Sequence, residues 1–505
     1  MRAGLFSVSY AGLWGQATLT LPEFVRNARQ LGYTSVMLMG KRPHLSPLDA
    51  RLRGLTHQTT TMKTTNRREF LKTTAGAGAA TAFAVLPASR GAGPNERVFL
   101  GVMGTGGRGT YLATAFARRP DAEVAWVCDA DARRLAQAQK AVAAAQARAP
   151  QAVQDFRQML EDRRIDAVIN ATPDHWHALG TILACQAGKD VYVEKPLCHN
   201  LWEGRQMVKA ARKYERVVQL GTQSRSAAYT RAAAEYVRAG KLGDLHLVRV
   251  FNMMEHPPMA LGPDQDQPPE LDYELWCGPA AKPPYNPRRS WLNVAEYSCG
   301  PIPGDAVHQL DLARWVLGDP PPPRSVSHAG GILALKDGRD TPDTQTATFD
   351  YSTFTLVFEA SLWTPYLTKT PMALRDQDRF PNWPFNGTRI ELLGTQGFMY
   401  VGRHGDGWQA FDAKGELAAS RYGRQGDKEH QDNFIACVRS RQKPNADVEI
   451  GHQSTLLCHL ANIAWRTGNR TLAFDRATET FPDAPEANRH LKRTYRAPWT
   501  VPEQV

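Results

Sequence analysis

Short apolar runs alternate with helical patterns along residues 95–225. The segments between the runs repeat their apolar residues at helical spacing. Alternating strands and helices are typical of a doubly wound parallel sheet with helices on its faces. We therefore predict an α/β domain here, with strands near Val98, Val124, Ala167, Val191 and Val217.

The pattern changes after Gly243, where the apolar runs become longer and richer in β-forming residues. These runs predict a large, mostly antiparallel open sheet. Helical spacing returns at 311–317, 428–439 and 452–466. We predict a second α/β domain over residues 226–480 and a tail at 481–505, with strands at 245–253, 344–351, 353–360, 388–393 and 398–401.

The first apolar run leads into a glycine turn, Gly104-x-Gly106-x-x-Gly109, which a helical pattern follows. A strand that bends sharply into a helix needs glycine for the bend, for the close approach of a pyrophosphate and for packing of the helix. Amides at the helix start, including those of Gly107 and Arg108, can hold the phosphates. The turn predicts a dinucleotide-binding Rossmann domain at 95–225.

Asp129 ends the next apolar run, twenty residues after Gly109. A carboxylate there can accept hydrogen bonds from the adenosine ribose and would repel a 2′-phosphate, which favours NAD. Arg108, Arg133 and Arg134 are close enough in sequence to accept that phosphate, so NADP stays possible.

Two polar groups follow strands of the predicted parallel sheet. Thr172 and Pro173, with His175 and His177, come after the run DAVINA, at the carboxyl edge where such folds bind ligands. The one-residue histidine spacing lacks a third ligand nearby, so we predict no metal site. In Glu194-Lys195-Pro196, proline keeps Lys195 extended, so its ammonium can point off the sheet toward a nicotinamide and act as acid or base.

The segment PIPGDAVHQLDLARW places Asp305, His308 and Asp311 three residues apart, on one helix face. Two interpretations stay open for Asp305. It is either the N-cap of the helix, after Gly304, or a member of a polar site with His308.

Together these motifs, with GTQSRS at 221–226, resemble the Gfo/Idh/MocA oxidoreductase family from about Arg97 to Asp475. The resemblance implies a Rossmann domain, a C-terminal α/β domain whose open sheet forms homodimers or homotetramers, and a tightly bound nicotinamide cofactor. It also implies that this cofactor contacts Thr172, Pro173, His175, His177, Glu194, Lys195 and Gln223.

The resemblance further implies that Lys195 contacts both substrate and cofactor, and that His308 is its partner in proton transfer. The family helix commonly carries an aspartate four residues before its histidine, where this chain has Gly304. Asp305 can substitute only if the helix start is shifted, so the Lys/Asp/His trio is incomplete.

The leading hypothesis is therefore NAD(P)-dependent oxidation of a sugar or glycoside hydroxyl, with Lys195, His308 and Asp305 as catalytic groups. Arg289 and Trp291 are predicted to contact the substrate, since a sugar site favours aromatic and polar side chains. One alternative is NAD-dependent glycoside cleavage through transient C3 oxidation and elimination. Another is a non-catalytic sugar-binding protein that retains the cofactor.

Net charge and cysteine content argue against a nucleic-acid-binding protein and against a fold held by disulfides or zinc. The net charge of +11 lies mostly in residues 1–94, which hold twelve Lys and Arg against three Asp and Glu. The remainder carries only +2, so we expect no nucleic-acid-binding face. The seven cysteines are scattered without a CxxC pair, which predicts neither a disulfide scaffold nor a zinc ribbon.

Residues 62–94 begin MKTTNRREFLK and continue with a mildly apolar run. Arg67 and Arg68, with Phe70 after them, resemble a twin-arginine export signal, so we expect a periplasmic protein. The apolar run is about half the length that spanning a bilayer requires, so we expect no permanent membrane span.

Residues 1–61 read as strand, helix and strand, which resembles the opening βαβ unit of sugar-phosphate isomerase/epimerase barrels. One such unit cannot close a barrel. We interpret it as a fusion remnant or an over-extended start, with Met62 as the functional start. If translation begins at Met1, the arginine pair is far from the terminus and a cytoplasmic protein is expected.

Overall fold

The computed structural model describes residues 4–6, 35–37 and 97–505, in two compact units, Met1–Ala88 and Ser89–Val505. In the first unit, strands β1 (Gly4–Phe6) and β2 (Ser35–Met37) pair in parallel. The helix predicted between these strands and the export segment at 62–94 lie outside the described residues.

Six parallel strands form the first sheet of the second unit, in the order β5-β4-β3-β6-β7-β8, which confirms the predicted doubly wound fold. The order reverses between β3 and β6, and ligands of such sheets bind beyond the carboxyl ends of the strands at that point. The strands are β3 (Val98–Met103), β4 (Ala122–Cys128), β5 (Gln151–Val153), β6 (Ala167–Asn170), β7 (Asp190–Val193) and β8 (Val218–Leu220).

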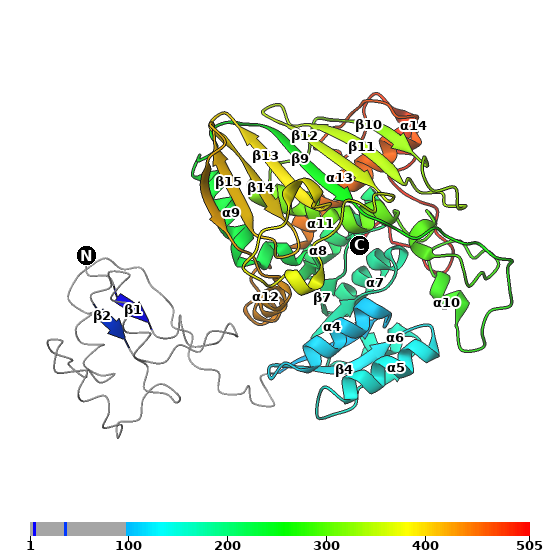
Figure 1. Ribbon diagram of the computed structural model, residues 1–505. Helices are drawn as coiled ribbons and strands as arrows, with labels where there is room; N and C mark the ends of the chain where they lie inside the picture. Colours follow the sequence, from blue (N-terminus) through cyan, green and yellow to red (C-terminus); the bar gives the residue numbers. More distant parts are fainter. Residues whose placement is uncertain (1–3, 7–34, 38–96) are drawn as a thin grey trace, which may run out of the picture. The chain divides into compact units, whose positions relative to one another are not determined.

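Helices cover this sheet, and one of them comes from far along the chain (Figure 1). Phe434 of α12 (Asp427–Ser440) packs edge-on against Phe116 and Tyr192, so α12 joins the core of the first sheet. The local helices are α4 (Gly107–Ala117), α5 (Ala132–Ala143), α6 (Phe156–Glu161), α7 (Asp174–Gln186) and α8 (Leu201–Lys213).

The second sheet has nine strands in the order β16-β15-β14-β13-β9-β12-β11-β10-β17. Only β9 and β12 pair in parallel, so the predicted, mostly antiparallel sheet is confirmed. Its strands are β9 (Leu245–Met253), β10 (Ser325–Gly331), β11 (Thr344–Asp350), β12 (Thr355–Ser361), β13 (Arg389–Gly394), β14 (Gly397–Gly402), β15 (Trp408–Asp412), β16 (Leu417–Arg421) and β17 (Leu472–Ala473).

The helices that share a hydrophobic core with the second sheet include α9 (Ala228–Arg238), α11 (Pro301–Val316) and α13 (Val448–Arg466). Helix α11 begins ten residues before the predicted 311–317, because proline fits the first helical turn. Asp305 therefore lies inside the helix, and the interpretation of Asp305 as its N-cap is wrong. Gly300 occupies that position.

Short helices and the C-terminal tail complete the unit. Trp499 in the tail packs against Phe156 and Trp176 of the first domain. The short elements are η4 (Gln223–Ser226), α10 (Tyr273–Cys277), η5 (Trp291–Asn293), η6 (Met372–Leu374), η7 (Trp383–Phe385) and α14 (Pro485–Asn488).

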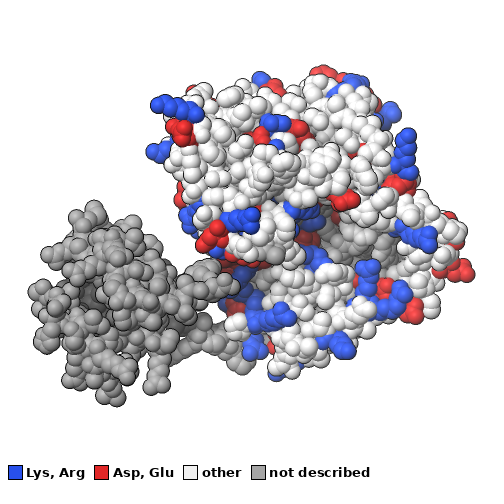
Figure 2. All heavy atoms as spheres, viewed as in Figure 1, with Lys and Arg blue, Asp and Glu red and all other residues white. Residues whose placement is uncertain are grey.

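Charged side chains of both signs are interspersed over the described face in Figure 2. Among the helices of the described ranges, none combines the length and the apolar character needed to cross a bilayer. All seven cysteines are buried and have free thiols.

Candidate cofactor and active site

The glycine turn between β3 and α4 has no room for side chains on its inner side. Gly104 has φ +79°, and a Cβ atom there would lie 2.6 Å from the carbonyl oxygen of Ala171. A Cβ atom at Gly109 would lie 1.8 Å from the carbonyl oxygen of Gly104. Both positions therefore require glycine.

The outer side of the same turn is open. A Cβ atom at Gly107 would meet nothing within 4 Å, and one at Gly106 would meet only the end of the Arg134 side chain. The turn faces a cavity of about 480 Å³, which Thr172 and Pro173 also line. The start of α4 thus offers open backbone amides to a phosphate, as a dinucleotide site requires.

Asp129 directly follows β4 and lines this cavity, and its role as a ribose-binding carboxylate stays a prediction. One of its oxygens accepts hydrogen bonds from the backbone amide of Thr105 at 2.7 Å and from its hydroxyl at 3.1 Å. The other accepts from the amide of Asp131 at 2.9 Å. Arg133 pairs with Asp131 at 2.9 Å, and both Arg133 and Arg134 line the cavity.

His175 and His177 are buried, and their ring nitrogens face backbone carbonyl groups. Those of His175 lie 2.9 Å from the Trp276 oxygen and 3.2 Å from the Tyr297 oxygen. Burial lowers the pKa of His175 to about 3, so its ring is neutral. His177 contacts the carbonyl oxygens of Pro196 at 2.6 Å and Thr172 at 2.9 Å. These contacts hold backbone segments together, and cofactor contacts by the two histidines stay predictions.

A second cavity of about 260 Å³ brings Lys195 and His308 together. Lys195 follows β7, and its ammonium donates a hydrogen bond to the carbonyl oxygen of Gly304 at 2.8 Å. His308 lies one helical turn after Gly304 on α11. The end of a parallel strand and a helix of the second domain thus form one polar site. Its wall also includes Arg108, Glu194, Gln223 and Asp305.

Arg108 lines both cavities and links them. Its guanidinium donates to Glu194 at 2.8 Å, and Asp427 lies 3.5 Å away. Burial raises the pKa of Glu194, but the charges of Arg108 and Lys195 outweigh it and hold that pKa below the usual value. Glu194 is therefore a carboxylate fixed by Arg108.

The electrostatics of α11 separate the roles of His308 and Asp305. Burial and the charges of Arg403 and Lys195 hold the pKa of His308 well below 6.5, so its imidazole is neutral. Asp305 pairs with Lys369 and Arg403, each at 2.9 Å. Although burial raises the pKa of Asp305, these cations hold it well below 3.8. His308 can accept a proton, whereas Asp305 is a fixed counter-ion.

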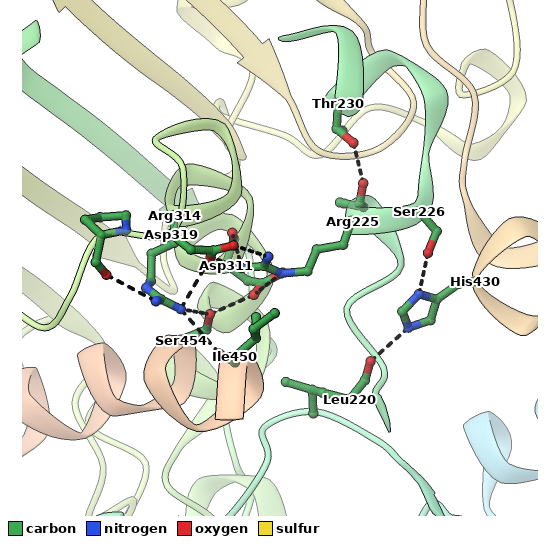
Figure 3. A network of polar contacts seen from close by, with 12 residues as sticks. Leu220, Arg225, Ser226, Thr230, Asp311, Arg314, Asp319, His430, Ile450 and Ser454 are labelled. Carbon is green, nitrogen blue, oxygen red and sulfur yellow. Dashed lines mark hydrogen bonds and ion pairs between the residues drawn. The ribbon is translucent and has the colours of Figure 1, made fainter. Parts of the chain in front are cut away.

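Asp311 faces a buried network instead of the cavity (Figure 3). Arg225 of η4 donates to both Asp311 oxygens at 2.8 and 2.9 Å and pairs with Asp319 at 2.6 Å. Asp311 also accepts a hydrogen bond from Ser454 of α13 at 2.7 Å. This network fixes the helix that carries His308 against two other elements.

The structure divides the predicted substrate residues between the two cavities. Arg289 and Trp291 line the cavity at the glycine turn, whereas Lys195, Asp305 and His308 line the other. Sequence reasoning missed four cationic or imidazole groups around Asp305 and His308. No motif marks them, and they are Lys369, Arg375, Arg403 and His404.

Models of one protein family match most of the second unit. A model described as "Oxidoreductase family, NAD-binding Rossmann fold" matches residues 98–222. A "GFO/IDH/MocA C-terminal domain" matches 230–400, and "Oxidoreductase family, C-terminal alpha/beta domain" matches 397–501. A twin-arginine translocation signal sequence matches residues 64–84.

Three curated relatives illustrate the range of similarity. The chain is 29% identical to 1,5-anhydro-D-fructose reductase of Ensifer adhaerens over 36% of this chain and 46% of that protein. It is 38% identical to a glycosyl hydrolase family 109 protein of Stenotrophomonas maltophilia, over 25% of this chain and 29% of that protein. Both matches span less than half of the relative. Myo-inositol 2-dehydrogenase of Thermotoga maritima is 23% identical over 72% of this chain and 94% of that one.

Solved structures share the fold. The WlbA dehydrogenase of Bordetella pertussis, crystallised with NADH and UDP-GlcNAcA, superposes with a TM-score of 0.56 at 21% identity, over 75% of this chain and 99% of that one. Aldose-aldose oxidoreductase of Caulobacter crescentus superposes with a TM-score of 0.57 at 17% identity, over 75% of this chain and 100% of that one.

Proposed function

The chain belongs to the Gfo/Idh/MocA oxidoreductase family and contains its NAD-binding Rossmann domain, and on that basis we propose that it oxidises a hydroxyl of a sugar or glycoside. The observation that carries the proposal is the shared cavity of Lys195 and a neutral His308. Relatives named for inositol and anhydrofructose support a polyhydroxylated substrate. The twin-arginine signal supports a periplasmic location.

The open side of the glycine turn fits an adenine dinucleotide. In this proposal the amides of Gly106, Gly107 and Arg108 hold the pyrophosphate, and Asp129 binds the adenosine ribose. Thr172, Pro173, Glu194 and Gln223 are the further contacts. When bound, NAD supplies the acceptor for the hydride from the substrate carbon.

Lys195 and His308 would manage the hydroxyl proton. The neutral imidazole of His308 accepts the proton as the C–H bond is oxidised. The Lys195 ammonium is held by the Gly304 carbonyl. It donates a hydrogen bond to the oxygen of the substrate hydroxyl and offsets the negative charge that develops on that oxygen. Asp305 acts through Arg403 and Lys369, so we propose a positioning role for it in place of the predicted catalytic one.

The test uses two variants with matched controls. Lys195→Met and His308→Asn should each lower kcat by about 10²–10⁴-fold on any accepted sugar, because each removes one partner in proton transfer. Lys414→Met and His246→Asn, at exposed positions, should keep wild-type turnover. NADH absorbance gives the rate, and the NAD content of each purified protein shows whether the site is intact.

Full turnover in both active-site variants would contradict the proposal. If Lys195→Met also kept the biological output of the protein, the non-catalytic alternative would be favoured, in which the chain binds a sugar and retains the cofactor.

The similarity to a glycosyl hydrolase family 109 protein favours one second candidate, NAD-dependent glycoside cleavage. In that reaction the sugar would be transiently oxidised at C3, the C2 proton would become acidic, and the aglycone would leave by elimination. Water would then add to the resulting double bond and the hydride would return to C3, so the cofactor is regenerated. Aglycone release without added NAD would favour cleavage, whereas net accumulation of NADH would favour dehydrogenation.

A further inference from the structure

The cavity that holds Lys195 and His308 has more cationic than anionic side chains in its wall. Its two histidines, His308 and His404, have pKa values well below 6.5 because of burial and nearby cations, so they add no charge at neutral pH. The wall therefore has one positive charge in excess. The cations are Arg108, Lys195, Arg375 and Arg403, and the anions are Glu194, Asp305 and Asp427.

Not every one of these cations has a carboxylate of its own as a partner. Asp305 is shared between Arg403 and Lys369, each at 2.9 Å. No carboxylate of the described residues lies within ion-pairing distance of Arg375. Its Nε donates to the Thr370 carbonyl oxygen at 2.8 Å, and with the side-chain amide of Gln425 turned over, the oxygen of that amide accepts from Nη1 of Arg375 at 3.3 Å. Arg375 thus has only neutral partners.

The positive charge of Arg403 disfavours the charged form of Arg375. Burial and then the charge of Arg403 lower the pKa of Arg375, and Asp406 and Asp305 offset only part of this effect. An anion bound between the guanidinium groups would relieve the repulsion and offer both groups a bidentate partner.

His404 gives independent evidence for a missing partner. It follows Arg403 directly after β14, lines the cavity and is 8% exposed. Its Nε2 is buried without a hydrogen-bond partner among the described residues. Buried polar atoms are nearly always satisfied in native proteins, so such an atom in a cavity wall points to a ligand group.

We propose that the substrate is a sugar acid whose carboxylate binds between Arg375 and Arg403, beside His404. This inference rests on the proposed function, in which Lys195 and His308 meet the hydroxyl to be oxidised. A carboxylate supplies negative charge that offsets this excess, and its planar fork matches the guanidinium geometry. A phosphate ester would also supply negative charge, so the test below compares it directly.

The test compares sugars that differ only in the acid group. NAD-loaded full-length protein is titrated by calorimetry with D-glucuronate and D-glucose, D-galacturonate and D-galactose, D-mannuronate and D-mannose, and glucose 6-phosphate. We expect at least one hexuronate to bind about tenfold or more tightly than its hexose. The inference is overturned if no hexuronate binds more tightly than its hexose, or if glucose 6-phosphate binds best.

Variants assign the preference to the arginine. Arg375→Gln should weaken hexuronate binding by about 10–100-fold, as expected for a lost charge-assisted hydrogen bond, and change hexose binding less than about twofold. Arg375→Lys keeps the charge without the planar fork and should give an intermediate loss. Arg324→Gln, at an exposed ion pair, is the matched control and should bind like wild type. Unchanged hexuronate affinity in Arg375→Gln would overturn the inference.

Failure of this inference and failure of the proposed function give different results. Hexuronate binding that depends on Arg375 but never yields NADH would leave the acid site standing and remove the proposed oxidation. Oxidation of neutral hexoses with no preference for hexuronates would support the proposed oxidation and remove the acid site.

Discussion

Asp311→Asn tests whether the buried arginine network holds the helix that carries His308. The side chains of Arg225 and Asp311 are both 0% exposed, and Asp311 accepts hydrogen bonds from Arg225 and Ser454. Asparagine keeps the shape but removes the charge, so Asp319 becomes the one carboxylate of the described residues that pairs with Arg225. Removing one partner of a buried ion pair costs roughly 3–5 kcal/mol. Because Asp319 still offsets the charge of Arg225, we expect a loss of about 2–4 kcal/mol.

The assay is urea unfolding of the full chain, followed by tryptophan fluorescence. Asp350→Asn is the matched control, because Asp350 pairs with Arg324 at the surface and the two side chains are 44% and 56% exposed. Such a pair contributes about 0–1 kcal/mol. Equal losses for the two variants, within about 0.5 kcal/mol, would refute the reasoning. A lower kcat for Asp311→Asn, measured where both variants are folded, would show that the network also positions His308.

Three further predictions concern pH and the cofactor. Burial raises the pKa of Glu203 to about 7, so wild type should lose stability as pH rises from 4.5 to about 7, and Glu203→Gln should be more stable at pH 8 by on the order of 2–3 kcal/mol. Equal thermal midpoints for the two proteins at pH 5 and pH 8 would contradict this. Because burial and nearby cations hold the pKa of His308 well below 6.5, kcat/KM should stay level as pH falls through 6.5, and an acid limb at or above that pH would contradict the combination of a lowered pKa and a proton-accepting role for His308. Gly109→Ala places Cβ 1.8 Å from the Gly104 oxygen, so α4 must shift and the NAD content of the purified protein should fall at least about tenfold, whereas full NAD content would show that the turn tolerates the methyl group.

The first sheet could be predicted because its central strands are buried on both faces and read as continuous apolar runs. Strand β5 was missed because it has three residues and lies at an exposed edge. In the second sheet, β10 reads SVSHAGG and β16 reads LAASR, so neither forms an apolar run. The start of α11 was misplaced because Pro301 and Pro303 suggest a loop unless they fall in the first turn of a helix.

The parts of the site that consist of short local sequence motifs could be predicted from the sequence. The glycine turn and the Lys195 segment are local motifs, and His308 lies on a recognisable polar helix face. Arg375 and Arg403 reach the same cavity from segments without a motif, far from Lys195 in sequence. Only the sheet topology brings them together, so residue spacing could not reveal the excess positive charge.

The packing of Trp499 against Phe156 and Trp176 has a consequence for how the protein is made. The nucleotide domain lies early in the sequence, yet part of its apolar core is supplied by residues near the very end. During translation that part of the core cannot close until Trp499 has emerged from the ribosome, well after the nucleotide domain itself. A nucleotide domain cut out alone, or transplanted onto a different partner, would expose the aromatic surface that this tail covers.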